Sequence, residues 1–252
     1  MRRLLLGSLL LSLCAVSPAQ AQFEAGVGLG YYDWHEDLSP VEVKESGPLL
    51  TGTLAWTQRG VGLVHLAYRG WGGLGVGNYR GSFQSAPTVP VEANTVFGAT
   101  TQEGQARWQT PSTVELISSL AFDFWHRQIS ASQQEDYALF SVILGAESRD
   151  PAAKGWSGGG GVRLPLWIRE DAHFDQVGFS TNPTLEPGQQ ASVRGSLRYR
   201  FTPHLSCTGS LDTFRLGKSQ TVTLEARRGT RTTAYQPATT LLMPGIGVEY
   251  RW

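Results

Sequence analysis

The last seven residues, Ile246-Gly247-Val248-Glu249-Tyr250-Arg251-Trp252, alternate apolar side chains with small or charged ones and end on an aromatic residue. Successive side chains of a β-strand point to opposite faces, so one face of this segment is apolar and the other carries Glu249 and Arg251. The apolar face suits lipid, and the charged face suits water. Tyr250 and Trp252 fit a membrane boundary, where an aromatic ring is buried while its polar atom stays hydrated. The segment therefore predicts a membrane-spanning strand.

The same segment resembles the C-terminal β-signal of Gram-negative outer-membrane β-barrel proteins, which ends in Phe or Trp after alternating apolar residues. The matching positions are Ile246, Val248, Tyr250 and Trp252. The resemblance implies an integral outer-membrane protein with an antiparallel up-and-down transmembrane β-barrel. It also implies insertion by the barrel assembly machinery, which would read this last strand as an assembly signal.

The N-terminus predicts export. A charged start is followed by an apolar run over residues 4–16, and Ala19 and Ala21 frame a cleavage site. These features predict a secretory signal peptide over residues 1–21 and a barrel domain over residues 22–252. After the signal, no apolar run reaches the roughly 20 residues that a spanning helix needs.

Composition narrows the class of protein further. The 21 basic and 21 acidic residues balance, which argues against a nucleic-acid partner, because such a partner requires a concentrated basic face. Only Cys207 remains after signal cleavage, so no internal disulfide can form. Lipidation at Cys14 is a weaker alternative, because Leu13 stands before it where a small residue is preferred.

Segments of alternating residues separated by turns recur along the chain, as in membrane barrels. They predict about ten strands, with eight or twelve as alternatives, and an even number places both termini in the periplasm. A Gly-rich stretch from Gly72 to about Val91 is predicted to be loop. Short periplasmic turns are expected near 58–60, 107–112 and 199–204, and long extracellular loops near 37–47, 72–93, 170–190 and 218–238. A soluble β-sandwich is the alternative, but it gives no reason for long connections to gather at one end.

Charged residues at mid-strand fall on the face opposite the apolar one and are predicted to line the lumen. A barrel of about ten strands has a narrow bore, so arginines can reach carboxylates across it. We expect Arg194 to pair with Asp212, and Arg251 with Glu24, as parts of a polar plug. The predicted lumen charges are Glu24, Glu115, Asp123, Glu147, Arg163, Arg169, Arg194, Arg198, Arg200, Asp212, Glu249 and Arg251.

Three histidines lie near carboxylates at strand ends that the predicted topology places outside the cell. Asp33 and His35 share a face of one strand, as do Asp171 and His173 of another, and an Asp in that position can orient an imidazole. The Asp171-Ala172-His173 spacing is similar to the Asp–His pair of omptins, ten-stranded outer-membrane proteases that use it with an opposing Asp pair. No opposing pair can be placed here, which departs from the omptin pattern, and no ligand spacing predicts a metal site. We therefore expect neither a cofactor nor enzymatic activity.

The last predicted outer loop is basic. Its cations are candidate ligands for lipopolysaccharide phosphates, since the guanidinium group of arginine binds phosphate through two hydrogen bonds. These residues are Lys218, Arg227, Arg228 and Arg231. The sequence as a whole predicts a structural or surface-binding barrel with a filled lumen. The alternatives are a narrow channel for small solutes and a surface hydrolase with a rim Asp/His site, and the oligomeric state is left open.

Overall fold

The computed structural model describes residues 21–38, 42–58, 63–83, 86–131, 133–151, 153–227 and 229–252. Residues 1–20 of the predicted signal peptide and Arg228 of the basic loop lie outside the described residues.

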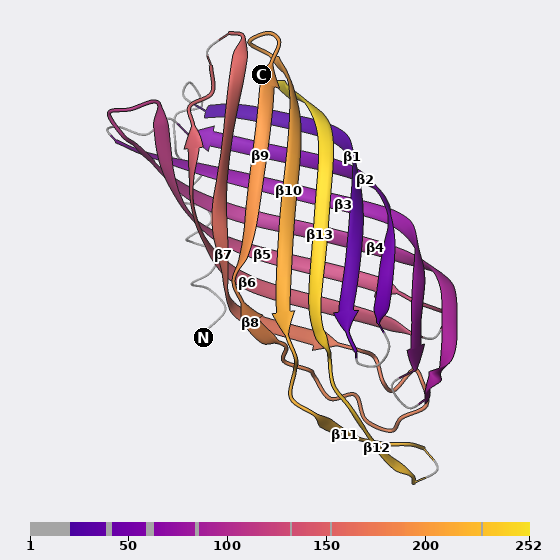
Figure 1. The fold of residues 1–252 in the computed structure, drawn as a ribbon. Helices are drawn as coiled ribbons and strands as arrows, with labels where there is room; N and C mark the ends of the chain where they lie inside the picture. The colour runs from indigo at the N-terminus through magenta and orange to yellow at the C-terminus, as the bar shows by residue number, and fades with distance from the viewer. Residues whose placement is uncertain are drawn as a thin grey trace, which may run out of the picture.

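Ten long antiparallel strands among the described residues form a closed barrel, as the sequence predicts (Figure 1). Its ladder closes because β13 pairs with both β10 and β1. The barrel strands are β1 (Ala21–Asp37), β2 (Val43–Gln58), β3 (Val64–Phe83), β4 (Ala86–Gln109), β5 (Val114–Gln128), β6 (Gln134–Ser148), β7 (Gly155–Asp171), β9 (Ser192–Arg200), β10 (Leu205–Gly217) and β13 (Ala238–Arg251).

Three short strands lie at one end of the barrel, and the first of them, β8, belongs to the same sheet as the ten long strands. Strand β8 (Gly188–Gln190) pairs with the last residues of β10, while β11 (Val222–Glu225) and β12 (Arg231–Ala234) form a separate hairpin that projects from the barrel (Figure 1). We call the end with this hairpin and the long connection between β7 and β8 the loop end. The opposite end, where the C-terminus lies and every connection is short, is the turn end.

The outer wall is apolar along the strands. Val27, Leu50 and Ile246 are 71%, 69% and 61% exposed, although side chains of this kind are normally buried in soluble proteins. Near the turn end, aromatic rings pack along the wall, including Trp156 on Tyr199 with ring centroids 4.7 Å apart. An apolar band bordered by aromatic residues is typical of a membrane barrel. No helix among the described residues is long and apolar enough to cross a bilayer.

The Gly-rich stretch from Gly72 to Val91 is not a loop, so that prediction is wrong. It belongs to β3 and β4, which pair continuously from Val64 to Ser82. Leu74 and Val76 point outward at 63% and 60% exposure, whereas Gly75 and Gly77 have the inward phase, where space is short. A Cβ atom on Gly77 would overlap the Tyr32 hydroxyl. The loop expected over 37–47 is also shorter, because β2 begins at Val43.

A β-bulge reverses the alternation of β7, which corrects the prediction for Arg169. Phe140 of β6 pairs with Trp167 and Ser141 pairs with Pro165, so Leu166 has no partner in this ladder. Proline has no N–H to donate to the ladder, which favours an irregularity at this point. Beyond the bulge, Ile168 is buried at 3% exposure and Arg169 is exposed on the outer wall. The sequence prediction assumed an unbroken strand and therefore placed Arg169 in the lumen.

This register can be tested with cysteine labelling in a Cys207→Ser background. Arg169→Cys should react quickly with a water-soluble maleimide, because the side chain lies on the exposed face. Ile168→Cys should stay unlabelled until the protein is denatured. Labelling is measured by mass spectrometry on the folded protein, and the reverse pattern would show that β7 continues without a bulge.

Candidate functional site

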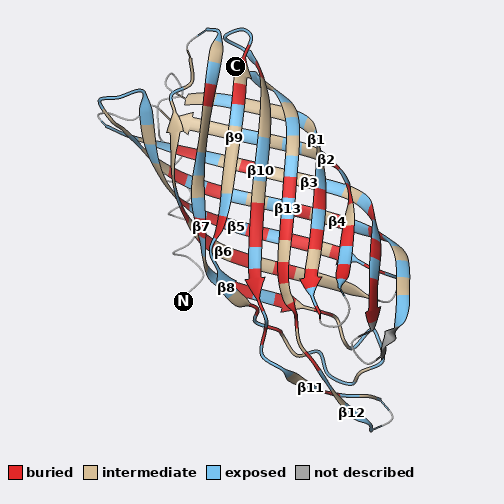
Figure 2. Cartoon of the chain, viewed as in Figure 1, coloured by how far each residue is buried: buried red, intermediate tan, exposed pale blue. Residues whose placement is uncertain are grey.

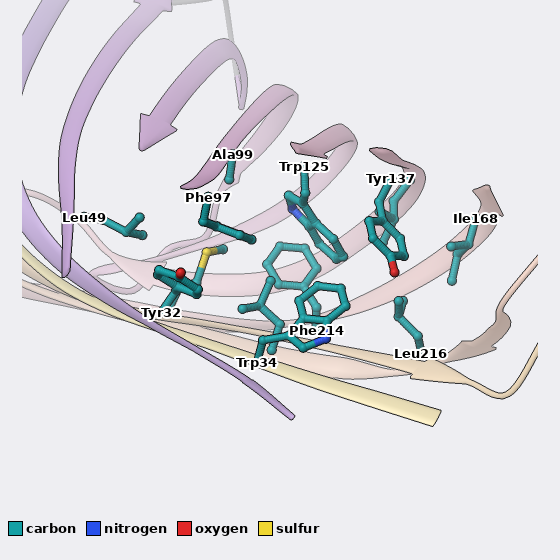
Figure 3. Packing of buried hydrophobic residues seen from close by; sticks show 13 residues of the cluster. Tyr32, Trp34, Leu49, Phe97, Ala99, Trp125, Tyr137, Ile168, Phe214 and Leu216 are labelled. Carbon is teal, nitrogen blue, oxygen red and sulfur yellow. The ribbon is translucent and has the colours of Figure 1, made fainter. Parts of the chain in front are cut away.

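A layer of aromatic side chains crosses the lumen in the half nearer the loop end. Trp34 of β1 and Phe214 of β10 meet Trp125 of β5 and Tyr137 of β6, which come from the opposite wall (Figure 3). The ring centroids of Trp125 and Phe214 are 4.7 Å apart and those of Trp34 and Tyr137 are 5.2 Å apart. All four residues are at most 2% exposed. The rings therefore fill the bore from wall to wall, and buried positions gather in this half of the strands (Figure 2).

Sequence reasoning predicted a polar filling and missed this layer. A signal was available, because Tyr32, Trp34 and Glu36 have the same strand phase as Glu24, and this is the lumen-facing phase. Phe97, Leu139, Leu241 and Met243 extend the buried cluster in the same way from other strands. The predicted filling by charged residues is therefore incomplete, because aromatic rings fill the bore at this depth and charged side chains lie on either side of the layer.

Arg127 forms a buried charged layer on the loop side of the aromatic rings. Its guanidinium lies 4.0 Å from the Trp34 ring centroid and contacts three carboxylates from different strands. The nitrogen–oxygen distances are 2.9 Å to Glu36 of β1, 2.9 Å to Glu45 of β2 and 2.6 Å to Glu135 of β6. None of these residues was predicted as a site residue. The layer therefore holds three carboxylates and a single guanidinium, which forms ion pairs with all three.

The mid-lumen charges pair across the bore rather than along one strand pair. Arg194 contacts Glu103 of β4 at 2.6 Å, so the predicted pairing of Arg194 with Asp212 is wrong. Asp212 instead lies 3.4 Å from Arg163, which also faces Asp123 at 3.8 Å. Register explains the error: Arg194 and Asp212 are directly opposite in the ladder, but the long arginine side chain reaches the far wall. A cavity of about 160 Å³ lies among these residues.

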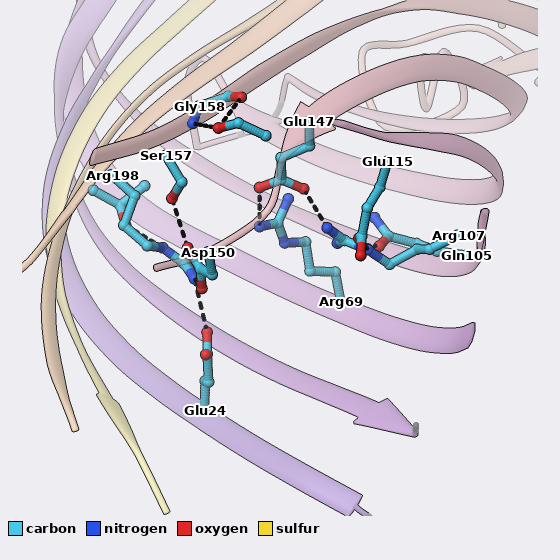
Figure 4. A network of polar contacts seen from close by, with 12 residues as sticks. Glu24, Arg69, Gln105, Arg107, Glu115, Glu147, Asp150, Ser157, Gly158 and Arg198 are labelled. Carbon is cyan, nitrogen blue, oxygen red and sulfur yellow. Dashed lines mark hydrogen bonds and ion pairs between the residues drawn. The ribbon is translucent and has the colours of Figure 1, made fainter. Parts of the chain in front are cut away.

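A denser ionic network closes the turn end (Figure 4). Arg251 pairs with Glu24, as the sequence predicts, and this contact joins the last strand to the first. Arg198 contacts Glu249 at 2.7 Å and Glu24 at 3.2 Å. The centre of the network is Asp150 of the β6–β7 connection, which sequence reasoning missed. Its carboxylate accepts hydrogen bonds from Arg198, Arg200, Arg251 and Ser157.

A second group at the turn end involves Glu115 and Glu147. Both pair with Arg107 at 2.9 Å, and Arg69 lies 3.9 Å from Glu147 (Figure 4). The carboxylates lie on neighbouring strands at directly opposed positions, so the arginine relieves their mutual repulsion.

A pocket of about 360 Å³ lies on the loop side of the aromatic layer. It is bounded by the inner faces of the strands and by residues of the β7–β8 connection and the β11–β12 hairpin. Its walls are mostly apolar, and Leu185 and Leu224 are each 1% exposed. Its volume falls in the roughly 300–1,000 Å³ range of small-molecule sites. This pocket is the main candidate site, and sequence reasoning did not predict it, because its lining comes from segments far apart in the chain.

The rim histidines lie on the outer face of the barrel. His126 Nδ1 lies 2.7 Å from Asp136 Oδ1, and His173 Nε2 lies 2.8 Å from Asp136 Oδ2. Asp171 is farther, with Oδ1 3.8 Å from His173 Nδ1. His173 has a φ of 48°, a conformation unusual for a residue other than glycine, and Asp171 Oδ1 accepts a hydrogen bond from its backbone N–H. The carboxylate that fixes the imidazole therefore comes from β6, and the contacts tether the β7–β8 connection to the barrel wall.

The other predicted rim pair, Asp33 and His35, also lies on the outer face of β1. The neighbouring Glu36, which lines the pocket, points to the opposite side of the same strand. Among the described residues, no group of three His, Cys, Asp or Glu side chains is arranged to hold a metal ion.

Two cations of the predicted basic loop make internal contacts. The Lys218 ammonium lies 3.8 Å from the Tyr235 ring centroid, and Arg227 donates a hydrogen bond to the backbone oxygen of Asp175. Arg231 is exposed at the start of β12. The Arg227 contact joins the hairpin to the β7–β8 connection, and these two segments together cover the pocket.

Comparisons with known proteins agree with this architecture. No family model matches the chain, and no curated protein matches its sequence. The crystal structure of the outer membrane protease OmpT from Escherichia coli superposes with a TM-score of 0.56 at 12% identity, covering 95% of this chain and 99% of that chain. The chain therefore has the fold of an outer-membrane β-barrel protein.

Two further structures show lower similarity. The toluene transporter TodX of Pseudomonas putida has a TM-score of 0.43 at 8% identity, covering 93% of this chain and 90% of its own. The attachment invasion locus protein Ail of Yersinia pestis has a TM-score of 0.34 at 9% identity, covering 92% of this chain and 99% of its own. The likeness concerns the fold alone and transfers no residue role to this barrel.

The Asp150 network gives a test of how the barrel is closed. Burial alone would raise the pKa of the Asp150 carboxyl, but Arg198, the Ser157 hydroxyl, Arg200 and Arg251 outweigh it and hold this pKa below its usual range. Asp150→Asn should therefore lower the free energy of unfolding at pH 7 by about 2–3 kcal/mol, somewhat less than the loss of a fully buried pair. The folded-state pKa is depressed, so the stabilisation is complete above the unfolded value near pH 4 and is lost as the pH falls below it.

The measurement is denaturant unfolding of the folded barrel in detergent at several pH values. The deficit of Asp150→Asn should shrink below about pH 4. Asp175→Asn is the matched control, since Asp175 is exposed in the β7–β8 connection. An equal effect of the two substitutions would contradict a central role for Asp150.

Proposed function

We propose that this protein is an integral outer-membrane barrel that does not conduct solutes and that binds a small ligand at the cell surface. The observation that carries the proposal is the aromatic layer of Trp34, Trp125, Tyr137 and Phe214, which spans the lumen beneath a pocket at the loop end. A pocket above a closed floor can hold a ligand but cannot pass it on to the turn end.

The orientation follows from the strand ends. The turn end carries the C-terminal residue and the short connections, and it becomes the periplasmic side under the usual topology of single-chain bacterial barrels. The loop end, with the pocket and the β11–β12 hairpin, then faces the outside of the cell. The predicted signal peptide supports the same compartment.

Two alternatives have less support. A narrow channel would need a continuous path, but the aromatic layer and the Asp150 network each fill the bore at a different depth. A rim hydrolase would need a free imidazole facing a cleft. His173 instead contacts Asp136 through one ring nitrogen and Gln176 through the other, on the outer face of the barrel.

The proposal includes two partners that the sequence suggests. Arg231 is exposed at the start of β12, and we propose that it binds lipopolysaccharide phosphates together with Lys218 and Arg227, because guanidinium and ammonium groups are suitable phosphate ligands. The alternating last strand, which pairs along its length with β1 and β10, is the element that the barrel assembly machinery would read as its signal.

Conductance of the purified protein in planar bilayers tests the closed lumen. The native barrel should give no steady channels. The double substitution Trp125→Ala with Phe214→Ala removes rings from opposing walls and should produce conducting events. Phe122→Ala is the matched control, because Phe122 lies on the lipid-facing side of the same strand and is 42% exposed. Steady channels of defined size in the native protein would contradict the proposal.

A further inference from the structure

We propose that the pocket at the loop end binds a small amphipathic organic cation, with an ammonium or amidinium group against its acidic floor and an apolar group against its walls. The inference rests on the proposed function and names the chemical class of its ligand. It depends on the charge, burial and partners of the residues that line the pocket.

The floor of the pocket has more carboxyl groups than cations. Glu36, Glu135 and Glu170 all line it, whereas its described lining contains no lysine or arginine. Arg127 lies between the pocket and the aromatic layer. It forms ion pairs with Glu36 and Glu135 and also with Glu45. Four carboxylates therefore share one guanidinium in this region. An anionic ligand would be repelled, and a neutral one would leave the imbalance unchanged.

Glu170 is the group that most requires a cation. It is 1% exposed, and the ion pairs found among the described residues do not include it. The Gln236 amide nitrogen, in the orientation that satisfies its neighbours, lies 3.2 Å from both Glu170 oxygens. That donor is neutral. A buried carboxylate without a cationic partner is costly and takes up a proton instead, so a cation entering the pocket would replace that proton and gain an interaction that the protein itself does not provide.

A second polar group points to the same conclusion about a ligand. Ser82 of β3 lines the pocket and is 7% exposed, yet its hydroxyl has no hydrogen-bond partner in the described part of the chain. Buried hydroxyls normally have one. A ligand ammonium or amidinium carries several N–H donors, so it could satisfy this oxygen as well as a carboxylate.

The remaining lining selects for an apolar group. Val43, Ile129, Leu185 and Leu224 present aliphatic surface from the barrel wall and from the two segments that cover it, and Tyr79 and Tyr235 add aromatic rings. The combination of apolar walls with a few converging polar groups is the usual composition of a small-molecule site. A small hydrated metal ion would not use these walls.

Phenethylamine is a suitable probe, because it carries one ammonium group and one aromatic ring. Binding is measured by isothermal titration calorimetry of the folded barrel in a non-ionic detergent. 2-Phenylethanol is the neutral comparison and 3-phenylpropanoate the anionic one. Each titration is repeated with protein-free micelles to subtract partitioning into detergent. The amine should bind saturably, and the alcohol and the anion at least about tenfold more weakly.

Glu170→Gln keeps the size of the side chain and removes its charge. It should weaken phenethylamine binding about tenfold, as expected for the loss of one charge-assisted contact. Glu92→Gln is the matched control, because Glu92 is 74% exposed on the outer wall and should leave binding unchanged. Leu224→Trp, which fills the pocket, should abolish binding. Circular dichroism melting establishes that each variant is folded.

The outcomes separate the two proposals. Equal binding of amine and alcohol, or an unchanged affinity in Glu170→Gln, would overturn the cation assignment. No saturable binding of phenethylamine would also overturn it, while a non-conducting native barrel would leave the closed lumen standing. Steady conductance in the native protein would refute the proposed function independently of the titrations.

Discussion

The closed antiparallel ladder, in which every second side chain faces a different medium, is the constraint on which the rest of the structure depends. Closure pairs β13 with β1 and β10, so the sheet has no free end strand. With backbone groups satisfied in this way, the outer face can be apolar and the inner face can carry charge. Gly28, Thr51 and other small inward residues of β1 and β2 leave room for long side chains that reach across.

The lumen is organised by depth rather than by wall sector. An acidic pocket floor, the aromatic layer, the Arg163 and Arg194 pairs and the Asp150 network follow one another from the loop end to the turn end. Arg163 links two of these layers, since its guanidinium lies 3.8 Å from the Phe214 ring centroid while it pairs with Asp212. Each layer joins opposing walls, which restrains a barrel whose neighbouring strands are otherwise held together only along their edges.

Strand phase could be predicted from the sequence, and with it the fold and most lumen charges. The observed structure differs from the prediction where a bulge changes the strand phase and where a side chain finds its ion-pair partner across the bore. The bulge at Leu166 inverts Arg169 and Ile168, and a strand pattern alone does not reveal one unpaired residue. Arg194 pairs with Glu103 rather than with its ladder neighbour Asp212, because the bore is narrow enough for the arginine side chain to reach the far wall. Asp150 was missed because it lies in a connection, outside any alternating segment, and the pocket was missed because the chain folds back over it.

The position of Asp150 has a consequence for the order in which the barrel forms. Its three arginine partners include Arg251, the penultimate residue of the chain, and through Glu24 the same cluster reaches the first strand. Until β13 docks, these like charges lack their full set of counterions, so late intermediates carry an electrostatic penalty that vanishes only on ring completion. Because the first and last strands are both joined to the β6–β7 connection through these ion pairs, a partly closed barrel is unfavourable and docking of the last strand becomes all-or-none.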